Sequence, residues 1–196
     1  MTAPLAGTGL LARIALRTGW KGLLAWIVGL VGLFAVTGLS IRELFATPEQ
    51  LAGYALALGD SMIMINGRIA GLDTAGGVVA NEFAFVATFA LPLMAIALVS
   101  RSTRREEEAG RYELLLSARI GRLAPLLAAV LVAAAAFVVL GLGLWAATLA
   151  LDVDRSGAVL YTCSLVATGW VYAASTAVIA QIVTHARTVW MVAMAG

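Results

Sequence analysis

The sequence predicts an all-α fold, a polytopic bundle of transmembrane helices, from its composition, its apolar runs and its charge distribution. The chain of 196 residues is 62% hydrophobic and 12% charged, about half the charged fraction of a typical soluble domain. Four uncharged runs are long enough to cross a hydrocarbon core of about 30 Å as helices. We therefore expect one multi-pass transmembrane domain over residues 1–196 with four complete spans. The four runs are residues 22–41, 83–99, 123–151 and 157–183.

Another apolar segment begins at residue 189 and reaches residue 196. Its eight residues rise only about 12 Å as a helix, less than half of the hydrocarbon core. We interpret residues 189–196 as the start of a fifth span. Either the sequence is a piece of a longer protein, or its end lies at the membrane surface.

The charged residues predict that the N-terminus is cytoplasmic. With this orientation the inside segments, 1–21, 100–122 and 184–188, hold ten basic and four acidic residues. The outside segments, 42–82 and 152–156, hold three basic and seven acidic residues. An excess of Lys and Arg on the cytoplasmic side is the rule for membrane proteins, so the charge distribution supports this orientation.

Residues 1–21 predict a short helix on the inner membrane surface. Arg13, Arg17 and Lys21 are four residues apart and so share a helix face, and Trp20 is a residue type that collects at membrane interfaces. The apolar run that follows is too long for a signal-peptide core and has no small-residue cleavage site at its end. We interpret it as a retained first span.

The outer loop, residues 42–82, predicts an amphipathic helix. Thr47 is a candidate N-cap, Pro48 suits the first helical position, and Gln50 completes a capping box. Apolar residues then recur at helical spacing as far as Leu58. The helix is either a lid packed on the outer ends of the spans, the commoner use of an apolar stripe, or a gate over an exit path.

The fourth predicted span carries a polar stripe in one helical sector, made by Ser164, Thr168, Tyr172 and Ser175. Serine and threonine in membrane helices commonly hydrogen-bond to a neighbouring helix. The alternative is that the stripe lines a substrate path. A metal site is not expected, because one histidine and one cysteine are too few of the usual ligands.

Residues 100–122 form a dense charged block between the second and third spans, with six arginines and four glutamates. Thr103 and Glu106 have capping-box spacing, and Glu107 with Arg111 forms an i, i+4 pair in the favourable order. We predict a cytoplasmic helix here. From the residues alone it is either an interfacial helix with snorkelling arginines or a surface for a partner.

The run TRREEEAGRYELLLSARIGR, residues 103–122, and the segment GLDTAGGVVANEF, residues 71–83, resemble permease subunits of ATP-binding-cassette exporters of the multidrug, polyketide-antibiotic and tetronasin-resistance type. The likeness covers most of the chain and is strongest from Gly71 to Arg122. Permeases of that family are much longer and have further spans. The resemblance therefore implies that the chain corresponds to the N-terminal part of such a permease, in the bacterial cell membrane.

The resemblance also implies how the protein is powered. Family permeases bind no nucleotide, and this chain has no G-x-x-x-x-G-K-[ST] motif, so we expect neither an enzyme nor a cofactor. ATP hydrolysis would belong to a separate cytoplasmic ATPase, expected as a dimer, into which the coupling helix of residues 101–122 would dock. The motif positions that would contact it are Glu106, Glu107, Glu108, Gly110, Arg111, Glu113 and Leu114.

The expected function is outward transport of hydrophobic or amphipathic compounds such as drugs and polyketide antibiotics, with no nucleic-acid partner. The alternative is a non-transporting membrane scaffold or assembly subunit whose charged block recruits a different cytoplasmic protein. An ATPase with a P-loop encoded beside the gene would favour transport, and its absence would favour the scaffold.

Overall fold

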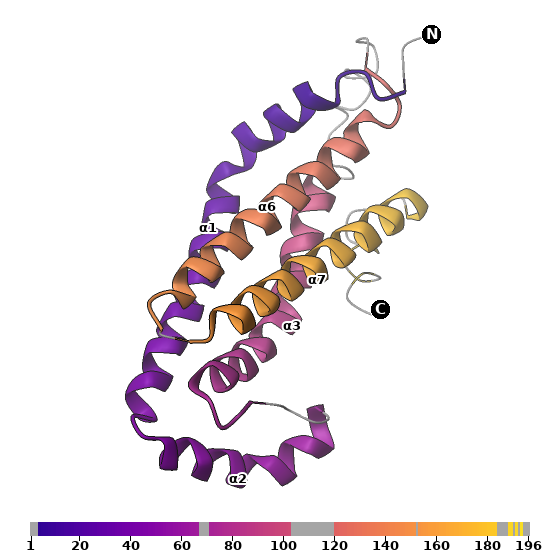
Figure 1. The fold of residues 1–196 in the computed structure, drawn as a ribbon. Helices are drawn as coiled ribbons and strands as arrows, with labels where there is room; N and C mark the ends of the chain where they lie inside the picture. The colour runs from indigo at the N-terminus through magenta and orange to yellow at the C-terminus, as the bar shows by residue number, and fades with distance from the viewer. Residues whose placement is uncertain are drawn as a thin grey trace. The chain divides into compact units, whose positions relative to one another are not determined.

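The computed structural model describes residues 4–66, 71–102, 120–151, 153–183, 188–189, 191 and 193, with the backbone alone for residues 58–66 and 102. In this part of the chain every regular element is an α-helix, which confirms the predicted fold class. The helices are α1 (Thr8–Leu44), α2 (Pro48–Asn66), α3 (Ala75–Ser102), α6 (Ala124–Thr148) and α7 (Arg155–Ile182) (Figure 1).

Four of these helices, α1, α3, α6 and α7, are long and apolar enough to cross a membrane. They contain 37, 28, 25 and 28 residues, and about 20 suffice for the hydrocarbon core. Large apolar side chains are exposed on each of them, among them Leu24, Phe85, Leu142 and Val171. Exposed apolar surface on this scale is typical of helices that face lipid.

Helix α1 joins the predicted surface helix and the predicted first span without a break. Its 37 residues, from Thr8 to Leu44, make a helix of about 55 Å, which is roughly 25 Å longer than the hydrocarbon core. Part of α1 must therefore extend beyond the core. Arg13, Arg17 and Lys21 place that part at the N-terminal end.

The start of α2 follows the predicted capping box. The N–H of Gln50 donates to Thr47 Oγ1 at 3.4 Å, and the N–H of Thr47 donates to Gln50 Oε1 at 3.1 Å. The helix runs to Asn66, past the predicted end at Leu58. A single glycine such as Gly59 costs a helix only about 1 kcal/mol, so the helix continues to the Asn-Gly turn signal.

Side-chain caps also set the starts of α3 and α7. The N–H of Gly77 donates to Thr74 Oγ1 at 3.1 Å, so α3 begins at Ala75, before the apolar run itself. The N–H of Gly157 donates to Asp154 Oδ2 at 2.6 Å at the start of α7. In the predicted start of a fifth span, residues 189–196, the structure describes residues 189, 191 and 193, and the rest of this prediction lies outside the described residues.

The chain forms two compact units, each with a part of every long helix. The first unit comprises Met1–Trp26, Phe89–Val139 and Val166–Gly196. Within it, α6 and α7 approach closely at Gly169, where a Cβ atom would overlap the ring of Phe137. The indole Nε1 of Trp170, the next residue, donates to the Ala134 carbonyl at 3.1 Å.

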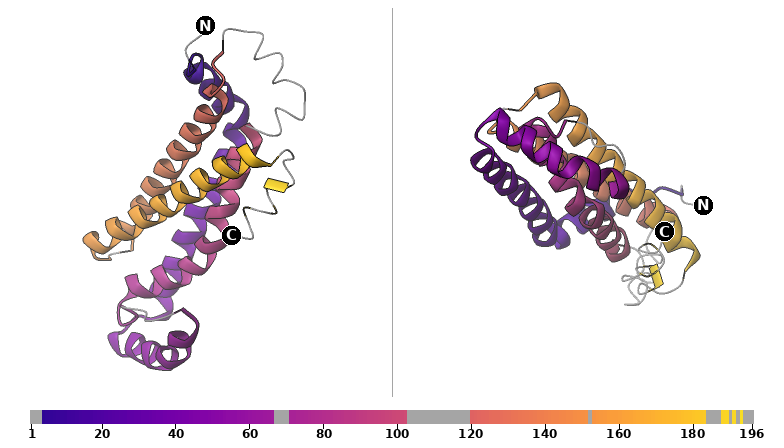
Figure 2. Two further views of the ribbon diagram at one scale, coloured as in Figure 1. Left: turned by 90° about the vertical axis from the view of Figure 1, so that its right-hand side faces the viewer. Right: turned by 90° about the horizontal axis from the view of Figure 1, so that it is seen from below.

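The second unit comprises Ile27–Thr88 and Leu140–Leu165 and has an aromatic core. Phe34 packs edge-on against Phe83, with ring centroids 5.0 Å apart, and stacks on Tyr161 at 6.5 Å. Such pairs add about 0.5–1.5 kcal/mol beyond the burial of their area. Figure 2 shows in two further views the short connection from α6 to α7, which belongs to this unit.

Candidate functional site

The residues predicted to contact an ATPase lie outside the described part of the chain, and their role stays a prediction. They are Glu106, Glu107, Glu108, Gly110, Arg111, Glu113 and Leu114. The structure does describe both ends of the segment that contains them. Helix α3 ends at Ser102, and the residues from Ile120 onward lead into α6.

The first end of the charged segment is attached to α1 by Arg101. Its Nη2 atom donates to the Thr18 carbonyl at 2.9 Å. The guanidinium group lies beside Gly19 and Gly22, 3.9 and 3.8 Å from the positions that their Cβ atoms would occupy. A cation in the last turn of α3 also interacts favourably with the negative end of that helix dipole.

The second end is attached to the residues that precede α1. The N–H of Gly121 donates to the Ala6 carbonyl at 2.8 Å, and the N–H of Leu123 donates to the Pro4 carbonyl at 3.1 Å. The two bonds are two residues apart on each segment and run in opposite directions along the chain, as in an antiparallel pair. We call residues 4–7 with 120–123 the N-terminal clasp.

Gly7 makes the clasp possible by its backbone conformation. Its φ is +87°, a value that residues with a Cβ rarely adopt. A Cβ atom there would lie 3.3 Å from Ile120 Cγ1. The side chain of Thr8, the next residue, donates to the Leu5 carbonyl at 2.8 Å where α1 begins.

A small apolar cluster lies behind the clasp. Leu11, Ala124 and Ala128 are buried together, and Ala12 and Ile120 pack against them. Burial of apolar surface contributes about 25 cal/mol per Å² to the stability of a fold.

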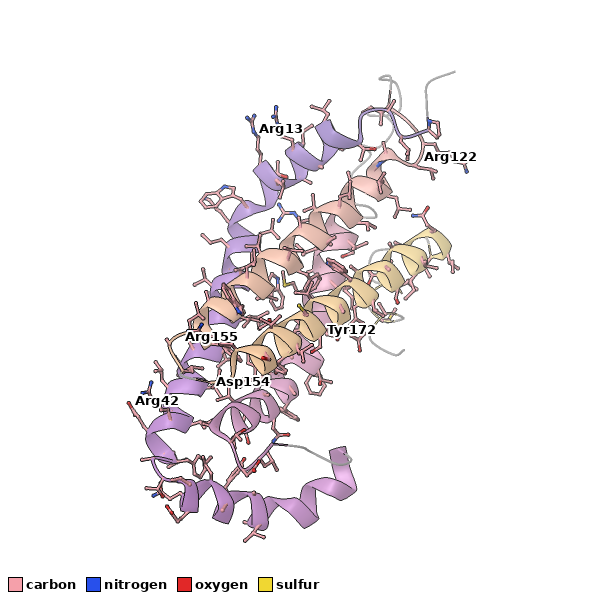
Figure 3. The ribbon with its side chains drawn as sticks, viewed as in Figure 1. Arg13, Arg42, Arg122, Asp154, Arg155 and Tyr172 are labelled. Atoms are coloured by element: carbon pink, nitrogen blue, oxygen red, sulfur yellow. The ribbon has the colours of Figure 1, made fainter. Side chains whose placement is uncertain are left out.

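The N-terminal quarter of the chain thus holds both ends of the charged segment, one through Arg101 and the other through the clasp. Figure 3 labels Arg122 at this end of the segment.

The side chains of the polar stripe on α7 are more exposed than those that line a path inside this bundle would be. Ser164, Thr168 and Ser175 are exposed and Tyr172, labelled in Figure 3, is half-buried. The Ser164 hydroxyl donates to the Tyr161 carbonyl of its own helix at 2.7 Å. Three of the four stripe residues thus lie on an exposed face of α7, and both roles of the stripe stay predictions.

Buried polar side chains of α7 lie beside this stripe. Thr162 and Thr176 are 4% and 1% exposed. Each donates to a carbonyl of the preceding turn, at 2.9 Å to Ala158 and 2.7 Å to Tyr172. These threonines thus use their hydroxyl protons within the helix.

Within the second unit, helix α2 packs against α3 and the end of α1 through Tyr54. The Tyr54 hydroxyl donates to Glu82 Oε1 at 2.7 Å, and its ring lies 4.9 Å from that of Phe45. Burial, followed by the hydrogen bond and the charge of Glu82, raises the pKa of Tyr54 to about 12. In Figure 1, α2 lies across the direction of α1 and α3 rather than along it.

The GLDTAGGVVANEF segment leads into α3 and caps it. Gly71 has a φ of +81°, and Gly77 lies so close to the Gly71 carbonyl that a Cβ atom would overlap it. Thr74 donates to the same carbonyl at 2.7 Å and caps α3. We did not predict this close approach and helix cap from the sequence, although the three glycines and one threonine of the segment were the available signal.

Comparison with known proteins supports a permease. No protein-family model matches the chain. Over 110 residues the chain is 41% identical to the multidrug efflux system permease protein Rv1217c of Mycobacterium tuberculosis. The match covers 53% of this chain and 19% of the relative, so the chain spans about a fifth of that protein's length. The fold and the comparison together describe a multi-pass helical membrane protein. Over about half of its length it is similar to a multidrug efflux permease.

Proposed function

We propose that this protein is the membrane-spanning part of an ATP-driven exporter of hydrophobic or amphipathic compounds. A separate cytoplasmic ATPase binds the charged segment of residues 101–122. The four membrane-crossing helices and the similarity to a multidrug efflux permease support the transport role. The substrate class fits the apolar surfaces of the helices, which offer few polar groups for a hydrophilic compound.

The attachment of both ends of the charged segment to one helix carries the coupling proposal. Arg101 is bonded to Thr18 of α1, and Gly121 is bonded to Ala6, two residues before α1 begins. A segment held at both ends moves together with the helix that holds it. Closure of an ATPase against this segment would then move α1 and the start of α6 rather than only a loose loop.

Reversal of the charges of Glu107 and Arg111 tests the coupling. The double variant E107R/R111E keeps the net charge, and an exposed pair contributes only a few tenths of a kcal/mol to a helix. The chain and a candidate ATPase are purified together and reconstituted in liposomes. Membrane insertion should be unchanged. Drug-stimulated ATP turnover should fall about tenfold or more, because an ion pair that is buried at an interface is worth at least about 1.4 kcal/mol, which corresponds to a factor of ten.

The matched control reverses two exposed charges on the other side of the predicted membrane. E43R/R155E also keeps the net charge, and both side chains are exposed. It should leave ATP turnover and complex formation unchanged. Normal turnover and complex formation in E107R/R111E would contradict the coupling role and favour an interfacial helix. A protein that binds the charged segment without ATP turnover would favour the scaffold alternative.

A further inference from the structure

The outward face of the N-terminal part of α1 carries three cations that the transport proposal does not use. Arg13, Arg17 and Lys21 are all exposed. Figure 3 shows the Arg13 side chain directed away from the helices. We call these three residues the basic face. We propose that the basic face binds the headgroups of anionic phospholipids.

Helix geometry places the basic face opposite the packed side of α1. At 3.6 residues per turn the three cations span a sector of about 80°. The buried positions of the same stretch, Leu11 and Leu23, lie on the other side of the helix together with Gly19, which faces Arg101. The packing that holds the charged segment therefore leaves the cations accessible.

Apolar side chains are interleaved with the cations on this outward face. Leu10, Ile14, Leu16, Trp20 and Leu24 are 59%, 45%, 44%, 54% and 50% exposed. A face that contacted only water or an acidic protein would not need large apolar groups at the same height as its charges. A lipid monolayer presents both partners, because phosphate groups lie directly beside glycerol and acyl chains.

The position along the helix agrees with the headgroup region. Arg13 to Lys21 cover about 12 Å of helix, which is comparable to the thickness of one polar layer of a bilayer. The Lys21 ammonium lies 6.0 Å from the ring centre of Trp20, and tryptophan is enriched at that depth. Leu24, one turn farther along, lies just inside the uncharged run.

Charge complementarity selects anionic lipids among the possible headgroups. Each Lys or Arg near an anionic membrane surface contributes attraction equivalent to about a fivefold change in affinity. Three cations on one face act on the same few headgroups. Zwitterionic headgroups offer a phosphate but no net charge, so they should be held much less strongly.

The test measures the lipid selectivity of the full chain in membranes of defined lipid composition that contain no other protein. The protein is reconstituted in phosphatidylcholine, and spin-labelled phosphatidylglycerol or phosphatidylcholine reports which lipid is held at the protein surface. The wild type should prefer phosphatidylglycerol several-fold, and 0.5 M salt should weaken the preference. The variant R13Q/R17Q/K21Q should lose most of it.

Single-charge variants give the matched comparison. Arg17→Gln removes one cation from the basic face, and Arg155→Gln removes one exposed cation from the start of α7. Arg17→Gln should lower the preference by less than the triple variant does, and Arg155→Gln should lower it less still. The charge-retaining variant R13K/R17K should keep it, since a headgroup is attracted by charge.

Two results would overturn the proposal. One is an unchanged preference for phosphatidylglycerol in R13Q/R17Q/K21Q, with helix content and oligomeric size as in the wild type. The other is an equal loss in Arg17→Gln and Arg155→Gln, which would show a general effect of net charge. Because no ATPase is present, neither result bears on the proposed transport function.

Discussion

Tyr54 joins the outer helix α2 to α3 through one phenol–carboxylate hydrogen bond. The Tyr54 hydroxyl lies 2.7 Å from Glu82 Oε1, and the residue is partly exposed. Its sequence position at i+3 from Leu51 predicted an apolar role in the stripe of the amphipathic helix. The sequence could not predict the bond, because Glu82 lies 28 residues away along the chain.

Replacement of Tyr54 by Phe should destabilise the protein modestly. Loss of one partly exposed hydrogen bond costs about 0.5–1 kcal/mol, which lowers the melting temperature by about 2–3 °C for a chain of this size. Melting in detergent by tryptophan fluorescence measures the change. Tyr172→Phe is the control, since no described residue is bonded to the Tyr172 hydroxyl, and it should melt like the wild type.

The same pair of proteins should show a pH dependence with a defined sign. The pKa of Tyr54 is about 12 in the folded protein and about 10 in an unfolded chain. A raised pKa stabilises the fold fully below about pH 10, and this contribution is lost as the pH rises through about 12. The advantage of wild type over Tyr54→Phe in melting temperature should therefore shrink as the pH rises above about 10 and reverse near pH 12, because a deprotonated tyrosine is disfavoured at this position. A constant difference would contradict the assignment.

Gly7 and Gly9 should respond in opposite ways to the same substitution. Alanine at Gly7, with φ +87°, costs about 1–2 kcal/mol of backbone strain. A Cβ atom at Gly9, inside α1, meets nothing within 4 Å, and alanine there should stabilise the helix by about 0.5–1 kcal/mol.

Amide hydrogen exchange measures the effect on the clasp directly. The amides of Gly121 and Leu123 are bonded to the Ala6 and Pro4 carbonyls, so peptides that begin several residues before Gly121 and include Leu123 report whether the clasp is closed. Gly7→Ala should speed their exchange about fivefold or more, whereas Gly9→Ala should leave it unchanged or slower. Unchanged exchange in Gly7→Ala would show that the clasp does not depend on this glycine.

At the scale of elements, the sequence predicted the long helices well and their ends less well. Uncharged runs fix the part of a helix that lies in lipid, because charge there is costly. Helix ends depend on caps, which lie outside the apolar runs. The box at Thr47 was recognisable from spacing, whereas Thr74 and Asp154 act as single capping residues in short connections.

The N-terminal clasp could not be predicted from the sequence. Its two partner segments, residues 4–7 and 120–123, have neither hydrophobic periodicity nor a charge pair, and they are more than 100 residues apart. Only the position of Gly7, just before a helical pattern, gave a local signal. Long-range backbone pairing of this kind depends on the fold as a whole.

At the scale of the molecule, the similarity to an efflux permease and the four apolar helices describe a multi-pass membrane protein. Its orientation is the claim on which coupling, lipid binding and the outer lid all depend. The charge distribution alone predicts it, since basic residues collect around the two ends of the charged segment and acidic residues around α2.

Thiol labelling in intact cells tests that orientation most directly. Cys163, the single cysteine, is first replaced by serine, and single cysteines are placed at Arg122, beside the clasp, and at Glu49, in the first turn of α2. Both positions are exposed. An impermeant maleimide should label Glu49→Cys in intact cells, and it should label Arg122→Cys only after the membrane is made permeable. Labelling of Arg122→Cys in intact cells, with Glu49→Cys protected, would contradict the account.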